Sequence, residues 1–303
     1  MKVWLPFPDY AESLGELPAG MDVDVYERED EPPASIGEVE FYVMPYVFSP
    51  RTVEVIAKMD ALRVVQTLTA GVDHVRPYVP GGVTLCNARG VHDASTAELA
   101  VTLTLASLRG VPDFVRGQDL GEWRFGFYPA LADRTVLIVG YGSVGEAVER
   151  RLAGFEVDVL RVARTARDGV AGIAELPRLL PGADVVILTV PITAGTRGLV
   201  DADFLAAMKD GALLVNVARG PVTDTEALLA ELSSGRLRAA LDVTEPEPLP
   251  PGHPLWRAPG VLISPHVGGS STAFRPRALR LVRRQLERYA AGEPLANVIE
   301  GPY

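Results

Sequence analysis

Cysteine is almost absent from this chain of 303 residues, which contains only Cys86. A single cysteine excludes an internal disulfide framework and argues against a metal site built on cysteine. Cys86 lies in the apolar run VTLCNA, a pattern typical of a small buried side chain. We therefore expect neither a disulfide nor a bound metal.

Basic charge is also scarce. The chain has 29 Lys and Arg residues against 39 Asp and Glu residues, which gives a formal net charge of −10. An acidic chain without a basic tract is a poor candidate for binding nucleic acid or an anionic membrane. An anionic small substrate would need arginines placed locally around it.

Long apolar runs and targeting signals are missing as well. No apolar stretch reaches about 18 residues without charges, so none predicts a membrane span. The first residues, MKVWLPFPDY, lack the apolar region of a signal peptide. With 48% hydrophobic residues the chain can bury a large core. These features predict a soluble, cytoplasmic protein.

Five short β-like runs occupy the first hundred residues, at 2–7, 22–28, 41–46, 63–68 and 83–88. Ser49 as N-cap and Pro50 at the first helical position predict a helix over 49–60. Strands that alternate with helices indicate a mainly parallel sheet.

A longer helix is predicted from Ser95 or Thr96, where Ser95 and Glu98 fit a capping box. Its apolar face would carry residues 99, 102, 103 and 106. This helix should leave the first domain and enter a second one.

From residue 136 the strand–helix alternation is clearer. Six mostly apolar runs follow, at 136–140, 157–162, 185–190, 213–218, 239–243 and 261–265. Continuous apolar strands are typical of a sheet covered on both faces, and six of them match a doubly wound nucleotide-binding sheet. The amphipathic segment 271–292 should return to the first domain. We predict one domain from 1–96 plus 276–303 and another from 97–275.

The segment VLIVGYGSVGEAVERRL places Gly140, Gly142 and Gly145 directly after a strand and at the start of a helix. In that context GxGxxG is a specific signal for a dinucleotide. The first glycine permits the tight turn, the second lets the backbone approach a pyrophosphate, and the third lets the helix pack on the sheet. Free amides at the helix start would face the phosphates.

The next strand ends without the expected acid. Eighteen residues beyond Gly145 is Ala163, where an Asp or Glu would accept hydrogen bonds from the adenosine ribose of NAD. Arg164, Thr165 and Arg167 follow it, and guanidinium groups match phosphate oxygens. The sequence therefore favours NADP, held by its 2′-phosphate. The alternative is that these arginines are solvated loop charges and that the chain uses NAD.

Three polar groups follow later strands at the same edge of the sheet: Arg219 in NVARG, Glu247 in ALDVTEPEP and His266 in SPHVGG. Reduction of a 2-oxo acid by hydride transfer needs a guanidinium for the carboxylate and a proton donor for the carbonyl oxygen. Histidine suits the second role, and a carboxylate beside it favours the imidazolium.

The other histidines are weaker candidates. His74 and His92 lie in TAGVDHV and RGVHDAS, and His253 lies in a proline-rich loop where exposure is expected. Only His266 lies at a sheet edge with glycines after it. Glu245 rivals Glu247, and the order EPEP does not decide between them.

Together, GYGSVG, NVARG, ALDVTEPEP and SPHVGG resemble the D-2-hydroxyacid dehydrogenase family. The resemblance extends from TAGVDHV to LANVIEGPY. It implies a Rossmann-type dinucleotide-binding domain inserted in a flavodoxin-like substrate domain, both α/β folds with a doubly wound parallel sheet. It also implies that Arg219, Glu247 and His266 form the catalytic group, which favours Glu247 over Glu245.

The resemblance also implies the binding residues. The substrate carboxylate would meet the turn Ala70, Gly71 and Val72 together with Arg219 and His266. Asp242 would accept a bond from the nicotinamide carboxamide or merely cap its strand. The predicted cofactor residues are Gly140, Tyr141, Gly142, Ser143, Val144, Gly145, Arg164, Thr165, Arg167, Thr189, Val190, Pro191, Thr196, Val217, Ala218, Asp242 and Gly268.

Ala163-Arg164 resembles the NADPH-using glyoxylate and hydroxypyruvate reductases of the family. We therefore expect NADPH-dependent reduction of a small 2-oxo acid, with Met44, Tyr46 and Arg275 near its side chain. The alternatives are an NAD-dependent enzyme for another D-2-hydroxy acid, of the phosphoglycerate or D-lactate type, and a dinucleotide-sensing binding protein without catalysis. The helix from Ser95 to Arg109 is apolar on several faces, which predicts a homodimer packed around it.

Overall fold

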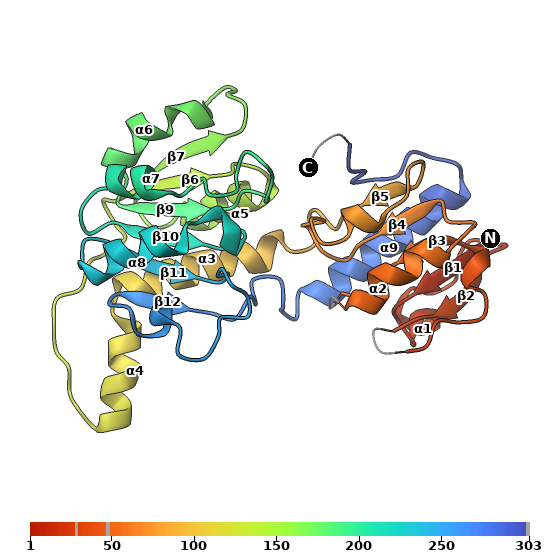
Figure 1. Cartoon of the computed structure of the whole chain (residues 1–303), viewed down its shortest axis with the longest axis horizontal. Coiled ribbons are helices and arrows are strands. Elements are labelled where there is room, and N and C mark those ends of the chain that lie inside the picture. The colour runs from red at the N-terminus through yellow and green to blue at the C-terminus, as the bar shows by residue number, and fades with distance from the viewer. Residues whose placement is uncertain (28–29, 47–48, 301–303) are drawn as a thin grey trace. The chain divides into compact units, whose positions relative to one another are not determined.

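The computed structural model describes residues 1–27, 30–46 and 49–300. The chain divides into two compact units (Figure 1). Unit 1 combines Met1–His92 with Thr272–Tyr303, and unit 2 is Asp93–Ser271. The chain thus crosses between units after His92 and Ser271, slightly before the predicted crossings after residues 96 and 275. Within the described ranges, no helix is long and apolar enough to cross a membrane.

Unit 1 is built on a five-stranded parallel sheet with the order β2-β1-β3-β4-β5 (Figure 1). This is the strand order of the flavodoxin-like doubly wound fold, as predicted. The apolar runs extend beyond the strands at several ends, and Arg28, the last residue of the second run, lies outside the described residues. The strands are β1 Lys2–Leu5, β2 Asp22–Val25, β3 Val39–Val43, β4 Val64–Gln66 and β5 Thr84–Cys86.

Alternate residues of these strands face opposite sides of the sheet. Val3 and Leu5 share a core with helix α9, whereas Trp4 and Tyr42 share one with helix α2. The C-terminal helix therefore returns to unit 1, as predicted. The helices of unit 1 are α1 Tyr10–Ser13, α2 Pro50–Glu54 and α9 Phe274–Ala290, with 3₁₀ turns η1 Ile36–Glu38, η2 Val55–Lys58 and η3 Arg76–Tyr78.

Unit 2 has a seven-stranded parallel sheet with the order β12-β11-β10-β9-β6-β7-β8. Its order around β6 is that of the Rossmann fold. Strand β8 was not predicted from the sequence, because two residues are too few to show periodicity. The strands are β6 Thr135–Val139, β7 Asp158–Ala163, β8 Ala171–Gly172, β9 Val185–Leu188, β10 Leu213–Asn216, β11 Arg238–Leu241 and β12 Val261–Ile263.

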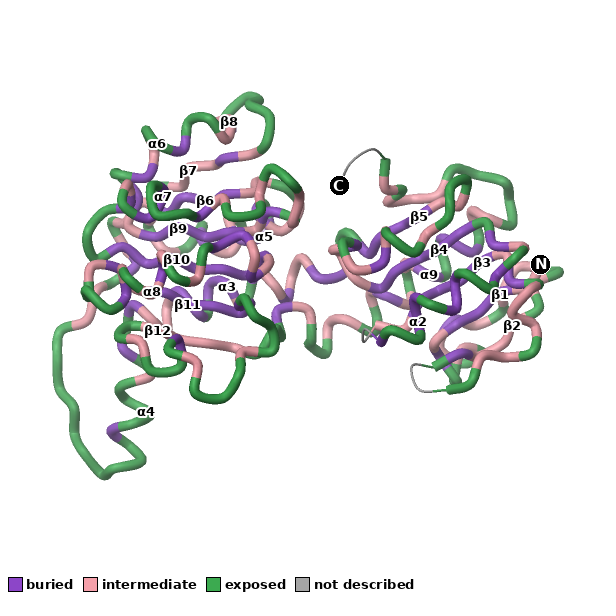
Figure 2. Tube along the Cα trace, in the orientation of Figure 1, coloured by how far each residue is buried: buried purple, intermediate pink, exposed green. Residues whose placement is uncertain are grey.

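Helices cover both faces of this sheet, so its strands are largely buried (Figure 2). Val136 and Ile138 of β6 face a core with α3 and α5, whereas Leu137 and Val139 face one with α6, α7 and α8. The elements are α3 Asp93–Leu108, α4 Val111–Leu120, α5 Ser143–Leu152, α6 Leu176–Leu179, α7 Ala202–Ala207 and α8 Thr225–Ser233, with η4 Ile173–Glu175, η5 Leu180–Gly182, η6 Gly220–Val222 and η7 Pro254–Arg257.

Helix α3 starts earlier than predicted. It begins at Asp93, so Ser95 and Glu98 lie inside it and the predicted capping box is wrong. The Glu98 side chain instead pairs with Arg151 of α5, with Nη2 and Oε1 3.3 Å apart. Thr102, which was predicted on the apolar face, is exposed.

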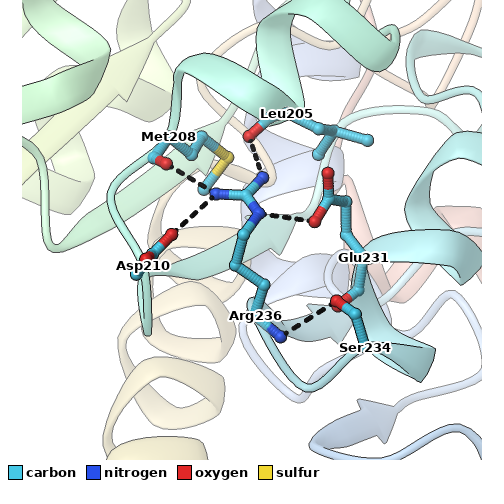
Figure 3. Close-up of polar contacts among 6 residues, drawn as sticks. All are labelled: Leu205, Met208, Asp210, Glu231, Ser234 and Arg236. Atoms are coloured by element: carbon cyan, nitrogen blue, oxygen red, sulfur yellow. Dashed lines mark hydrogen bonds and ion pairs between the residues drawn. The ribbon is translucent and has the colours of Figure 1, made fainter.

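Arg236 joins the ends of α7 and α8 (Figure 3). Its guanidinium donates to the carbonyl oxygens of Leu205 and Met208 at 2.5 and 2.8 Å, and its Nε lies 2.6 Å from Glu231. Carbonyl groups at the end of a helix have no partner within the helix, so a long arginine can satisfy them. This network fixes the segment that leads into β10, whose other end carries Arg219.

Candidate active site

The loop between β6 and α5 is the segment GYGSVG, residues 140–145. Gly140 has a φ of +107°, and a Cβ atom there would lie 2.6 Å from the amide nitrogen of Val190. A Cβ atom at Gly145 would lie 2.9 Å from the Gly140 carbonyl oxygen. Both positions require glycine, because one carries the sharp turn and the other lets the helix pack closely.

The first turn of α5 offers backbone donors. In the described ranges, the amides of Ser143, Val144 and Gly145 have no acceptor, and no side chain caps the helix. A Cβ atom at Gly142 would meet nothing within 4 Å. Unsatisfied amides at a helix start, reached through open space, fit the pyrophosphate of a dinucleotide.

The loop after β9 packs on this turn. Thr189 donates through Oγ1 to the carbonyl of Gly140 at 2.8 Å, and Val190 approaches the same glycine. The hydroxyl of Thr196 donates to the Pro191 carbonyl at 2.6 Å and stabilises its own loop. Thr189 and Val190 therefore pack on the phosphate loop. Cofactor contacts by Thr189, Val190, Pro191 and Thr196 stay predictions.

The tip of β7 carries exposed arginines. Ala163 ends the strand, and Arg164, Thr165 and Arg167 follow on the surface. Arg167 Nη2 donates to the carbonyl of Tyr141 at 2.6 Å. Neither Arg164 nor Arg167 pairs with a carboxylate in the part of the chain that the structure describes. Arg167 is thus a cation with no carboxylate partner, held against the phosphate loop.

Arg219 follows β10, after the buried residues Val217 and Ala218. It is half-buried, and Nη1 donates to the Ala218 carbonyl at 2.8 Å. A Cβ atom at Gly220 would lie 1.9 Å from the carbonyl oxygen of Thr244. Only glycine permits this approach, so the NVARG loop packs directly against the start of the EPEP loop.

His266 and Glu247 form a pair. Nδ1 of His266 lies 2.5 Å from Oε1 of Glu247, and the side chains are 45% and 38% exposed. Because Glu247 occupies Nδ1, Nε2 is the ring nitrogen left to meet a substrate. Glu245 is exposed, and its carbonyl accepts a bond from the Thr225 hydroxyl. The carboxylate that contacts the histidine therefore belongs to Glu247.

Asp242 holds the turn that carries His266. Its carboxylate is 3% exposed and accepts bonds from the Ser264 hydroxyl and from the amides of Val267 and Gly268 at 2.6, 2.9 and 2.8 Å. Strand-end capping is thus what Asp242 does in the structure, and a bond to the nicotinamide carboxamide stays a prediction.

His92 and His253 make hydrogen bonds that stabilise the fold. His92 is buried, with Nε2 2.7 Å from the Leu68 carbonyl oxygen. His253 is half-buried rather than exposed, and its Nδ1 accepts the Leu255 amide at 3.3 Å at the start of η7. His74 is half-buried in unit 1.

In unit 1, the turn after β4 contains Ala70, Gly71 and Val72. In the described part of the chain the amides of Gly71 and Val72 have no acceptor, which fits an anionic group. Asn87 Nδ2 donates to the Ala70 carbonyl at 2.7 Å, and Thr69 Oγ1 donates to the Gly71 carbonyl at 2.8 Å. The contact of Asn87 with this turn was not predicted from the sequence, because no local motif indicates a hydrogen bond between residues 17 positions apart.

The residues expected near the substrate side chain have other surroundings. Met44 lies in the core and is 3% exposed, so it lines no open surface. The Tyr46 ring packs against Phe274 in a tilted arrangement, with centroids 4.1 Å apart. Arg275 pairs with Asp9.

Comparison with known proteins gives one family. Residues 101–268 match the model described as D-isomer specific 2-hydroxyacid dehydrogenase, NAD binding domain. A glyoxylate reductase from Thermofilum pendens is 35% identical over 253 residues, which cover 78% of this chain and 75% of that protein.

Two solved structures of related proteins are similar to this chain over 99% of its length. A D-isomer specific 2-hydroxyacid dehydrogenase from Xanthobacter autotrophicus, in complex with NADPH and MES, is 32% identical with a TM-score of 0.84, over 99% of this chain and 97% of the other. An NADPH-dependent glyoxylate/hydroxypyruvate reductase from Sinorhizobium meliloti, in complex with NADP and sulfate, is 28% identical with a TM-score of 0.83 over the same shares.

Proposed function

Because the chain belongs to the D-isomer specific 2-hydroxyacid dehydrogenase family, we propose that it reduces glyoxylate or hydroxypyruvate with NADPH. It is an NAD(P)-dependent oxidoreductase that acts on small 2-oxo acids. The observation that carries the proposal is the contact of His266 with Glu247, in the unit whose sheet also carries the GYGSVG loop. A purely cofactor-sensing protein would have no need of that pair.

Each side chain has a task in the reaction. When bound, the reduced nicotinamide supplies the hydride to the substrate carbonyl carbon. His266 donates a proton from Nε2 to the carbonyl oxygen as negative charge develops there. Glu247 accepts a hydrogen bond from the Nδ1–H group of His266, which orients the ring and stabilises it while it is protonated. Arg219 binds the substrate carboxylate and polarises the carbonyl. In unit 1, the amides of Gly71 and Val72 are donors that suit a carboxylate.

NADPH is the proposed cofactor because β7 ends in Ala163, at the position where an acid would bind the ribose of NAD, and two arginines follow it. Ala163 has no group for a free ribose hydroxyl, whereas Arg164 and Arg167 are exposed and pair with no carboxylate in the described residues. A 2′-phosphate would gain charge-assisted bonds there, and one sound contact implies roughly tenfold or more preference for NADPH.

We also propose a homodimer, with a different surface from the one predicted. Helix α3 packs on α5 and on β10 to β12 of its own unit. Most of the large exposed apolar side chains lie instead in 111–127, where Trp123, Phe125 and Phe127 are 95%, 81% and 97% exposed. Charges in this segment pair internally, as in Arg124 with Glu122. A surface that is largely apolar, and whose three acids and two arginines leave little net charge, fits a second copy of itself.

Turnover of hydroxypyruvate tests the function, because its product has a chiral centre. The purified protein should oxidise NADPH with glyoxylate and with hydroxypyruvate, and chiral chromatography should identify D-glycerate. The kcat/KM ratio of NADPH over NADH should exceed one and fall as salt rises. The double change Ala163→Asp with Arg164→Ala should reverse that ratio. Absence of turnover, or formation of L-glycerate, would contradict the proposed activity. The cytoplasmic location expected from the sequence stays a prediction.

A further inference from the structure

Glu149 on α5 is a carboxylate in contact with the phosphate loop. Its Oε2 atom accepts hydrogen bonds from the Tyr141 hydroxyl and from Nε of Arg161, the latter at 2.8 Å. Its Oε1 atom accepts a hydrogen bond from Nη2 of Arg161. In the described part of the chain, Glu149 is the carboxylate bonded to a residue of the GYGSVG segment. Its charge is therefore matched by a bidentate arginine rather than exposed beside the loop.

Two arginines flank the Tyr141 ring. The guanidinium carbons of Arg161 and Arg167 lie 5.8 and 5.7 Å from its centroid, within the range of cation–π attraction. They differ in their partners, because Arg161 is paired with Glu149 whereas Arg167 bonds the Tyr141 carbonyl. Paired backbone bonds between Arg167 and Val170, at 2.9 and 2.8 Å, also hold Arg167 in place.

An unmatched Glu149 would act against a bound phosphate in two ways. Its charge would repel the phosphate, and it would attract Arg167, whose guanidinium lies on the same tyrosine ring. The guanidinium of Arg161 holds the pKa of Glu149 below its usual range, so the carboxylate is ionised at neutral pH. The matching charge therefore comes from Arg161 and not from protonation.

We propose that Arg161 determines cofactor specificity as a positioning residue: it neutralises Glu149 and fixes Tyr141, which keeps Arg167 available for the 2′-phosphate of NADPH. The proposal rests on the proposed preference for NADPH. It assigns the preference to four residues, Tyr141, Glu149, Arg161 and Arg167, of which Arg161 and Glu149 need not touch the cofactor.

Equilibrium binding tests the proposal without reference to activity. Calorimetric titration of the full chain with NADPH and NADH is compared for the unmodified protein and Arg161→Met, which removes the charge and keeps an apolar stem. Arg161→Met should weaken NADPH by about tenfold, equivalent to about 1.4 kcal/mol, and change NADH by less than about twofold. The unchanged NADH affinity also shows that the variant folds.

A second substitution separates charge neutralisation from a structural role. Glu149→Gln in the Arg161→Met background should restore NADPH affinity to within about threefold of the unmodified protein, because the uncompensated charge is gone. Glu149→Gln alone should not weaken NADPH. Arg151→Met is the matched control: Arg151 also joins α5 to another element through a glutamate, Glu98, and should leave both affinities unchanged.

The outcomes separate this proposal from the proposed cofactor preference. Equal loss of NADPH and NADH affinity in Arg161→Met, with no recovery on adding Glu149→Gln, would overturn the role of Arg161. So would unchanged NADPH affinity in Arg161→Met when the unmodified protein prefers NADPH. Tighter binding of NADH than NADPH by the unmodified protein would instead overturn the cofactor preference itself.

Discussion

The main-chain amide of His266 donates to the main-chain carbonyl of Asp242 at 2.8 Å, and the Asp242 carboxylate binds the next two amides of the same turn. His266 has a φ of +52°, a region that residues other than glycine rarely adopt. A strained position persists only where the surroundings determine it. Asp242 is therefore the residue that keeps the imidazole beside Glu247.

Asp242→Asn should lower kcat, because the new amide group cannot accept all the bonds that the two carboxylate oxygens accept. A displaced imidazole costs about a hundredfold when the shift is near 1 Å. Steady-state kinetics together with NADPH titration check this, and the NADPH dissociation constant should change little. A large rise in that constant would support the carboxamide contact instead. Ser264→Ala, which removes one of the three bonds, should have a smaller effect.

His266→Ala should lower kcat by about a thousandfold while NADPH still binds, because the proton donor is lost. Glu247→Gln should lower kcat by less than His266→Ala, since the imidazole stays in place but loses the carboxylate that orients it. The kcat at saturating NADPH is the measurement, and Glu245→Gln is the matched control. A loss of kcat in the control variant alone would assign the role to Glu245.

Arg219→Ala should lower kcat/KM for the 2-oxo acid by about a thousandfold or more, because carboxylate binding and carbonyl polarisation are lost together. Arg219→Lys should recover little, since an ammonium group cannot make the paired contact of a guanidinium. Both are checked with glyoxylate at saturating NADPH. Near-normal turnover of the lysine variant would rule out this role for Arg219.

Replacing Trp123 and Phe127 by serine should convert a dimer into a monomer, because the exposed apolar surface of segment 111–127 is then reduced. Sedimentation at micromolar concentration checks the state of both proteins. Leu99→Ala tests the other surface, helix α3, around which the sequence predicted the dimer. This variant should remain a dimer. A stable monomer in the unmodified protein would contradict the homodimer.

Cys86 should be unreactive in the folded chain. It is buried in β5, and burial raises the pKa of its thiol to about 11. At pH 8 about one thiol in a thousand would be ionised, and the thiolate is the reactive form. Titration with a colourless disulfide reagent that releases a chromophore should detect no thiol in the native protein and one per chain after unfolding. Rapid labelling of the native chain would show that β5 opens.

Apolar periodicity and short motifs predicted much of this molecule. Runs of apolar residues located the strands of both sheets except β8, because strands covered on two faces are apolar along most of their length. The GYGSVG segment identified the dinucleotide unit, because the fold requires glycine at 140 and 145, and Gly142 leaves the space beside the helix start open. The family and the reaction class followed from the joint presence of four motifs.

Contacts between distant residues were not predictable in this way. Nothing in the sequence near Asp242 shows that its carboxylate binds the turn of His266, and the capping box at Ser95 failed because α3 begins earlier than its local pattern suggests. The bond between Glu149 and Arg161 was also missed, since it joins a helix to the following strand. The apolar character of α3 was attributed to a dimer; part of the helix packs on α5 and β10 of its own unit, whereas Leu99 and Leu105 stay partly exposed.

Gly220 has no side chain, yet a methyl group there would lie 1.9 Å from the Thr244 carbonyl. Even alanine would force the loops of Arg219 and Glu247 apart. A mutational scan scored by turnover would therefore rank position 220 beside the reacting residues. Loss of turnover on substitution at position 220 would reflect a steric clash and not the loss of a reacting group. Measuring cofactor binding or folding in each variant would distinguish these two causes.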